Sequence, residues 1–129
     1  MGNRIPAANL KLKRAYEPAD ESDGVRILVD RLWPRGVSKT RARLDLWMKD
    51  IAPSAELRTW FGHDPARWDE FQGRYMTELR NDPTQIHELR TLARSGPVTL
   101  VYSARDERHN DAVVLRALLL GRNAANRAG

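Results

Sequence analysis

The chain contains no cysteine among its 129 residues, which excludes disulfide bonds, thiolate metal ligands and a cysteine nucleophile. Its three histidines, His63, His87 and His109, include no pair at the His-x-x-x-His spacing of a helical zinc site. The glycine-rich motifs that bind nucleotide phosphates, Gly-x-Gly-x-x-Gly and Gly-x-x-x-x-Gly-Lys, are also missing. We therefore expect neither a bound metal ion nor an organic cofactor.

Long apolar segments are absent as well. No run of about 18 apolar residues is present that would cross a membrane. The first residues lack the apolar core of a signal peptide. Together with the missing cysteines, which suit a reducing compartment, these features predict a soluble cytoplasmic protein that makes no contact with membranes. They leave its oligomeric state open.

The size and composition are typical of one globular domain. Hydrophobic residues make up 41% of the chain and charged residues 30%, and 129 residues are enough to bury one core. We expect a single domain over residues 1–129. Its ends, 1–9 and 121–129, are rich in small and polar residues and are predicted to be flexible tails.

The chain is basic, with a net charge of +5. A basic balance indicates an anionic partner, either a small ligand or a nucleic acid. The 22 basic residues are mixed with 17 acidic ones along the whole sequence, and no long basic run occurs. A nucleic-acid-binding module is therefore the alternative, and a small anionic ligand such as a phosphate compound is the preferred partner.

Apolar periodicity and capping residues predict an α/β fold of three layers, in which helices cover a small, mostly parallel sheet. Residues 44–51 alternate between apolar and polar, which favours a strand without excluding a helix. The clearer strands are expected at 10–16, 25–30 and 98–102. Helices are expected at 55–61, from Asp64 to about residue 80, at 84–94 and at 112–120.

Polar residues follow two of the predicted buried strands. In parallel sheets, ligands collect beyond the carboxyl ends of the strands, and the N-terminus of a following helix attracts anions. Guanidinium groups bind phosphate or carboxylate through two parallel hydrogen bonds. The sequence thus predicts an anion pocket at this edge, although loop arginines that pair with Asp30, Asp106 or Asp111 are the simpler alternative. The candidate ligand-binding residues are Asp30, Arg31, Trp33, Arg35, Tyr102, Arg105 and Asn110.

One residue of these loops is suited to proton transfer. His109 titrates near neutral pH when unperturbed, and Asp106, three residues earlier, could orient its ring. The pair is the candidate catalytic centre if the protein is an enzyme, which the sequence does not decide. A capping or packing role for His109, and an N-cap role for Asn110, are equally compatible with their position. Ser103 lies outside any Gly-x-Ser-x-Gly motif, which argues against a serine nucleophile.

Four segments, spread over about residues 10–120, resemble the YeaO-like branch of the bacterial family called domain of unknown function 488. They are Val29-Asp30-Arg31-Leu32-Trp33-Pro34-Arg35-Gly36, the segment 46–54, the segment 60–68, and Tyr102-Ser103-Ala104-Arg105-Asp106 with His109-Asn110. The resemblance implies a small cytoplasmic α/β domain and no particular activity.

The chain departs from the pattern of the larger members of that family. Those members carry a Cys-x-Glu segment after the equivalent strand and Cys-His-Arg before the last helix. Only the histidine is matched, by His109, and Asn110 stands in place of the arginine. Thiol chemistry therefore does not transfer, and the resemblance implies a location only: the loops after Asp30 and after Tyr102.

Overall fold

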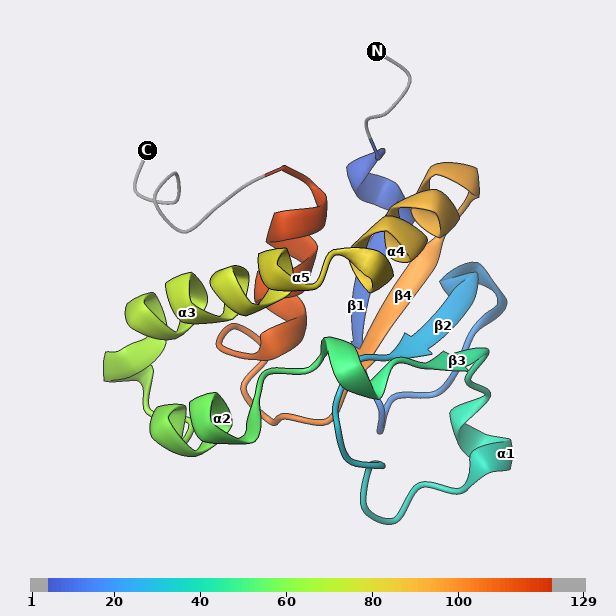
Figure 1. Ribbon diagram of the computed structural model, residues 1–129. Helices are drawn as coiled ribbons and strands as arrows, with labels where there is room; N and C mark the ends of the chain where they lie inside the picture. Colours follow the sequence, from blue (N-terminus) through green and yellow to red (C-terminus); the bar gives the residue numbers. More distant parts are fainter. Residues whose placement is uncertain (1–4, 122–129) are drawn as a thin grey trace.

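The computed structural model describes residues 5–121 and contains one four-stranded sheet in which every strand is parallel to its neighbours (Figure 1). The order is β1-β4-β2-β3. Both inner strands, β4 and β2, thus end side by side. The predicted α/β class with a parallel sheet is confirmed. The strands are β1 (Leu10–Arg14), β2 (Val25–Leu28), β3 (Leu46–Trp47) and β4 (Val98–Tyr102).

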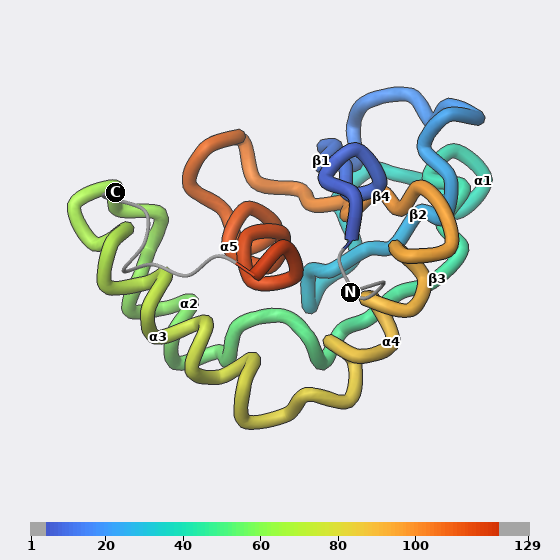
Figure 2. The backbone as a smooth tube through the Cα atoms, turned by 90° about the horizontal axis from the view of Figure 1, so that it is seen from above, coloured from blue at the N-terminus to red at the C-terminus, as the bar shows by residue number. Residues whose placement is uncertain are grey.

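The helices lie mainly on one face of the sheet (Figure 2). Helix α5 packs directly on β1 and β4, α3 packs on α5, and α2 packs on α3. Within residues 5–121, no helix is long and apolar enough to cross a bilayer. The α-helices are α1 (Lys39–Ala42), α2 (Ala55–Phe61), α3 (Trp68–Asn81), α4 (Thr84–Ser95) and α5 (Asp111–Leu119). Short 3-10 turns occupy Ala7–Asn9, Glu21–Asp23, Lys49–Ile51 and Pro65–Arg67.

Capping residues set the helix boundaries where the sequence predicts them. The Ser54 side chain accepts a hydrogen bond from the N–H of Leu57, and Gly62 ends α2 in the left-handed conformation with φ of 52°. Asp64 caps the turn that leads into α3. At the start of α5, the Asn110 side chain accepts from the N–H of Val113.

The helix-facing side of the sheet is apolar and fully buried. Ile27 and Val29 lie on this side and are 0% exposed. Leu28, on the opposite side, is 0% exposed as well, as the continuous apolar run predicts for a parallel strand. The predicted core face of α3 is confirmed too. Its buried residues include Trp68, Phe71, Tyr75 and Leu79.

Within residues 5–121, the opposite side of the sheet is partly polar and is covered by α1, the turn Glu21–Asp23 and loop segments. Arg26 is buried there and binds the carboxylate of Asp23 at 2.7 Å, and Lys13 binds the same carboxylate at 3.1 Å. Burial by itself would raise the pKa of Asp23. Hydrogen bonds from the Asp20 N–H, Lys13 and Arg26 outweigh it and hold the pKa below its ordinary value. This charge network closes the second face with few apolar residues.

Two predicted segments differ from the structure in extent. Segment 44–51 forms a strand only at Leu46–Trp47 and then turns into the 3-10 helix Lys49–Ile51, because β3 is an edge strand that pairs with β2 alone. Within the predicted N-terminal tail, Ala7–Asn9 forms a turn, and the Asn9 side chain donates a hydrogen bond to the carbonyl of Ala93. Residues 1–4 and 122–129 lie outside the described part of the chain.

The sheet order places the two polar loops at the same edge. Beyond the paired residues Leu28 and Val101, the N–H of Val29 donates to the carbonyl of Val101 at 3.1 Å. The loop after β2 and the loop after β4 therefore start beside each other, and the second of them leads into the N-terminus of α5.

Candidate functional site

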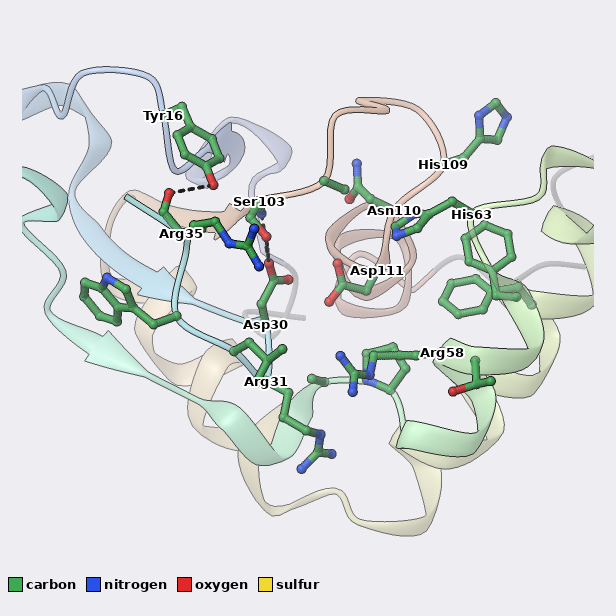
Figure 3. Close-up of a pocket in the computed structure, with 18 residues that line it drawn as sticks. Tyr16, Asp30, Arg31, Arg35, Arg58, His63, Ser103, His109, Asn110 and Asp111 are labelled. Carbon is green, nitrogen blue, oxygen red and sulfur yellow. Dashed lines mark hydrogen bonds between the residues drawn. The ribbon is translucent and has the colours of Figure 1, made fainter. Parts of the chain in front are cut away.

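A cavity of about 640 Å³ opens at the carboxyl edge of the sheet. It lies between the loops that follow β2 and β4, the N-terminus of α5 and the helix α2 (Figure 3). Its volume is within the range of small-molecule sites. Both loops that the sequence singles out contribute to its wall, as does α2, which comes from a different part of the chain.

The floor of the cavity is built around Asp30. Its Oδ2 atom accepts one hydrogen bond from the backbone N–H of Ser103 and another from the Ser103 hydroxyl, each at 2.8 Å. The carboxylate thus joins the end of β2 to the end of β4. The contact with Ser103 fixes the orientation of the Asp30 carboxylate, and it is marked by dashes between the two residues in Figure 3.

A second carboxyl group, that of Asp111, lies beside Asp30. Asp111 is the first residue of α5, is partly exposed, and lines the cavity. Burial raises the pKa of Asp111 well above its ordinary value. The negative charge of Asp30 and a hydrogen bond between the two carboxyl groups raise this pKa further. The raised pKa favours the protonated form of Asp111 next to Asp30.

Three arginines, Arg31, Arg35 and Arg58, line the same cavity. In Figure 3, the Arg35 guanidinium lies near Asp30 and Ser103, while Arg58 extends from α2 toward Asp111. The Arg31 side chain points away from the carboxyl pair.

Among the described residues, none of these three arginines forms an ion pair. The Nε atom of Arg31 is buried and has no hydrogen-bond partner within that part of the chain. The wall of the cavity thus carries three guanidinium groups and two carboxyl groups, and its net charge is positive. Within residues 5–121, Arg31 and Arg35 therefore form none of the ion pairs with Asp30, Asp106 or Asp111 that the predicted alternative requires.

Aromatic side chains form two further parts of the wall. Phe61 and Phe71 stack on each other with ring centres 4.3 Å apart. Trp33 lines the other side, where its indole N–H donates to the carbonyl of Val37 at 2.6 Å. These contacts hold the rings in place and give the cavity flat apolar surfaces next to its charged groups.

His109 lies at the rim. Its Nδ1 atom is 2.8 Å from Oδ2 of Asp106, the contact that the sequence predicts. Its ring packs edge-on against the ring of Trp68, with the two ring centres 5.1 Å apart. Hydrogen bonds from the N–H of Arg108 and from His109 lower the pKa of Asp106. In Figure 3 the imidazole points away from the carboxyl pair, so His109 is held by a carboxylate at the entrance rather than at the floor.

The structure brings most of the predicted ligand-binding residues together, but not all of them. Tyr102 is 2% exposed and belongs to the hydrophobic core, and Arg105 and Asp106 are exposed outside the cavity wall. Asn110 is buried, with its amide group donating to the carbonyl of Asp106 and its oxygen capping α5. The predicted residues that line the cavity are Asp30, Arg31, Trp33, Arg35, His109 and Asn110.

Sequence reasoning missed two charged residues of the cavity as site residues. Asp111 follows the predicted N-cap Asn110, and its place at the first turn of the last helix could have indicated that it faces the sheet edge. Arg58 carries no such signal, because it is an exposed residue of α2 in a segment that contacts the other two loops only through the tertiary fold.

Fold and site together define a small parallel α/β protein with a positively charged cavity at the carboxyl edge of its sheet. The family model described as the inactive DUF488-N3 subclade matches residues 9–129, and the chain belongs to this family. This confirms the predicted relationship to the YeaO-like branch.

Two uncharacterised relatives are similar over most of their length. A protein of Mycobacterium tuberculosis is 46% identical over 118 residues, which cover 92% of this chain and 99% of the relative. The YeaO protein of Escherichia coli is 46% identical over 107 residues, covering 83% and 93% respectively. No solved structure gives a significant match.

Proposed function

We propose that this protein binds a small anionic ligand, such as a phosphate compound, in the cavity at the carboxyl edge of the sheet. The observation that carries the proposal is the set of arginines that line this cavity without an ion pair in the described chain. A guanidinium without a carboxylate partner is free to bind an incoming anion through two hydrogen bonds.

Two of the arginines are the principal anion ligands of this proposal. Arg35 and Arg58 point toward the carboxyl pair from opposite walls, whereas Arg31 points elsewhere and contributes mainly its charge (Figure 3). The N-terminus of α5 adds a favourable field for an anion, worth roughly 0.3–1 kcal/mol. The ligand would therefore lie between Arg35, Arg58 and the first turn of α5.

We further propose that the ligand is bound without being turned over and that the protein works in the cytoplasm. The family is described as inactive, and His109 lies at the rim, where it contacts Asp106 and Trp68. A catalytic role of His109 with Asp106 would instead require a reacting group at the entrance of the cavity. Release of phosphate from bound phosphate esters, lost in His109→Ala, would support that alternative.

Isothermal titration calorimetry with inorganic phosphate tests the binding site. Arg35→Ala and Arg58→Ala should each weaken binding about tenfold, the low end expected for charge-assisted hydrogen bonds of exposed arginines. Arg80→Ala is the matched control, because Arg80 is exposed on α3 outside the cavity wall and its removal changes the net charge equally. Equal affinity in all four proteins, or no binding by the wild type, would refute the site.

The nucleic-acid alternative makes a different prediction. Binding to duplex DNA or to RNA would weaken steeply with salt through counterion release, and every exposed arginine near the contact would matter. A gel shift with the same variants separates the two cases, since a basic surface does not single out Arg35 and Arg58 over Arg80.

A further inference from the structure

Resting on the proposed anion site, we propose that Asp30 and Asp111 recognise a pair of adjacent hydroxyl groups, so that the ligand is a phosphorylated sugar or polyol. The arginines would hold the phosphate, and the carboxyl pair would hold the hydroxyl groups a few bonds away. The two groups of side chains share one cavity, so one molecule of this type could reach both.

The carboxyl pair is fixed before any ligand arrives. Oδ2 of Asp30 accepts both hydrogen bonds of Ser103, and Oδ1 of Asp111 accepts from the N–H of Ala112 at 3.0 Å. Each carboxyl group therefore has one oxygen bound to the protein. Both residues line the cavity and are only partly buried, so the pair is accessible to a ligand.

The chemistry of the pair favours hydroxyl groups over a cationic group. Ser103 binds one oxygen of Asp30 and Ala112 binds one oxygen of Asp111, so the other oxygen of each carboxyl group can accept from a ligand. The raised pKa of Asp111 favours an acid O–H that can also donate. A hydroxyl group both donates and accepts hydrogen bonds, and so it matches such a pair. An ammonium group only donates, and it would also meet the positive field of Arg35 and Arg58.

A metal ion is a weaker occupant for the same two carboxyl groups. Among residues 5–121, no group of three or more histidine, cysteine, aspartate or glutamate side chains is placed to hold one. The nearby guanidinium groups also oppose a divalent cation. Elsewhere in the cavity wall, the rings of Phe61, Phe71 and Trp33 offer flat apolar surfaces on which the carbon skeleton of a sugar can pack.

Calorimetry with four probes tests this inference: inorganic phosphate, ribose 5-phosphate, 2-deoxyribose 5-phosphate and O-phosphoethanolamine. The wild type should bind ribose 5-phosphate at least tenfold more tightly than each of the other three. The 2-deoxy sugar lacks the adjacent hydroxyl pair, and phosphoethanolamine replaces hydroxyl groups with an ammonium group.

Asp30→Asn should abolish the preference for ribose over 2-deoxyribose without lowering the affinity for inorganic phosphate. The asparagine keeps an oxygen that can accept from Ser103, and circular dichroism checks that the variant folds. Asp111→Asn, which is isosteric and leaves Asp30 and its Ser103 contacts in place, provides a second variant and should reduce the same preference. Ser22→Ala, on the exposed surface outside the cavity, is the control.

The possible results separate the two proposals. Wild-type affinities that are equal for ribose 5-phosphate and inorganic phosphate would overturn the hydroxyl inference and leave the anion site standing. Tighter binding of phosphoethanolamine, or a ribose preference that persists in both variants, would overturn it as well. If none of the four probes binds, the anion site itself is refuted, and the inference falls with it.

Discussion

The contact between Asp30 and Ser103 joins the ends of the two central strands, and its removal gives a sharp test of the site. In Asp30→Ala, the backbone N–H and the hydroxyl of Ser103 lose their shared acceptor. Because both lost hydrogen bonds run to a charged group at 2.8 Å, each would contribute about 1.5–3 kcal/mol in a fully buried setting.

The expected loss of stability is smaller than the sum of those two contributions. Asp30 and Ser103 are only partly buried, so water molecules can form hydrogen bonds with Ser103 in place of the two that are lost. Removing the Asp30 charge also removes one cause of the raised pKa of Asp111, and that raised pKa disfavours the folded state above pH 3.8. We therefore expect the free energy of unfolding to fall by about 2 kcal/mol, at the low end of the range. This corresponds to a decrease in Tm of roughly 6–10 °C for a chain of this size.

Urea denaturation followed by circular dichroism, together with a thermal melt, measures this effect. Ser103→Ala, which removes only the hydroxyl donor, should cost about 1 kcal/mol, and Asp30→Asn should cost less than Asp30→Ala because its amide oxygen can still accept. The double variant Asp30→Ala with Ser103→Ala should be no less stable than Asp30→Ala alone, since the hydroxyl has already lost its partner. Additive losses in the double variant, or a wild-type stability in Asp30→Ala, would refute this account of the contact.

Two further predictions concern the wall of the cavity and the proton of the carboxyl pair. The buried hydroxyl of Tyr75 donates to the carbonyl of Ile51 at 2.7 Å and holds the segment that leads to the cavity wall. Tyr75→Phe should therefore lower the free energy of unfolding by about 1–2 kcal/mol in urea melts, and an unchanged value would contradict this role. The folded state favours a proton on Asp111 that the unfolded state loses above pH 3.8, so the contribution of Asp111 to wild-type stability falls as pH rises from 3.8 through the raised pKa. Asp111→Asn does not titrate at this position, so its Tm relative to wild type should increase over that window, and a difference that is independent of pH would contradict the raised pKa of Asp111.

The parts of the structure that depend on local chemistry were predictable from the sequence. Ser54, Asp64 and Asn110 each have a short polar side chain that caps a helix start, and the sequence marks all three. The apolar run in β2 likewise predicts a strand that is buried on both faces, and a parallel sheet follows from it.

The burial of Tyr102 could have been predicted from the alternation of side chains along β4. Side chains alternate between the two faces of a strand, and Tyr102 has the same parity as Val98 and Leu100, which belong to the core beneath the helices. Its position predicted a buried ring rather than a ligand contact. The hydroxyl group of Tyr102 is chemically suited to a ligand contact, but the alternation of side chains along β4 places Tyr102 in the core.

Other parts of the site depend on contacts between distant segments. Arg58 enters the cavity because α2 packs on α3 and α3 packs on α5, and no local pattern encodes that arrangement. The raised pKa of Asp111 likewise arises from burial and from the charge of Asp30, a residue that is far away in the sequence and becomes a neighbour only when β2 and β4 pair.

The most direct test of the anion site is a titration of the ¹⁵N-labelled protein with inorganic phosphate, followed by amide chemical shifts in NMR spectra. The proposal predicts saturable shift changes that cluster at residues 30–35, 58–63 and 103–112, and the loss of these changes in the double variant Arg35→Ala with Arg58→Ala. Changes spread over the basic residues of the opposite sheet face, or no saturable change at any phosphate concentration, would contradict it.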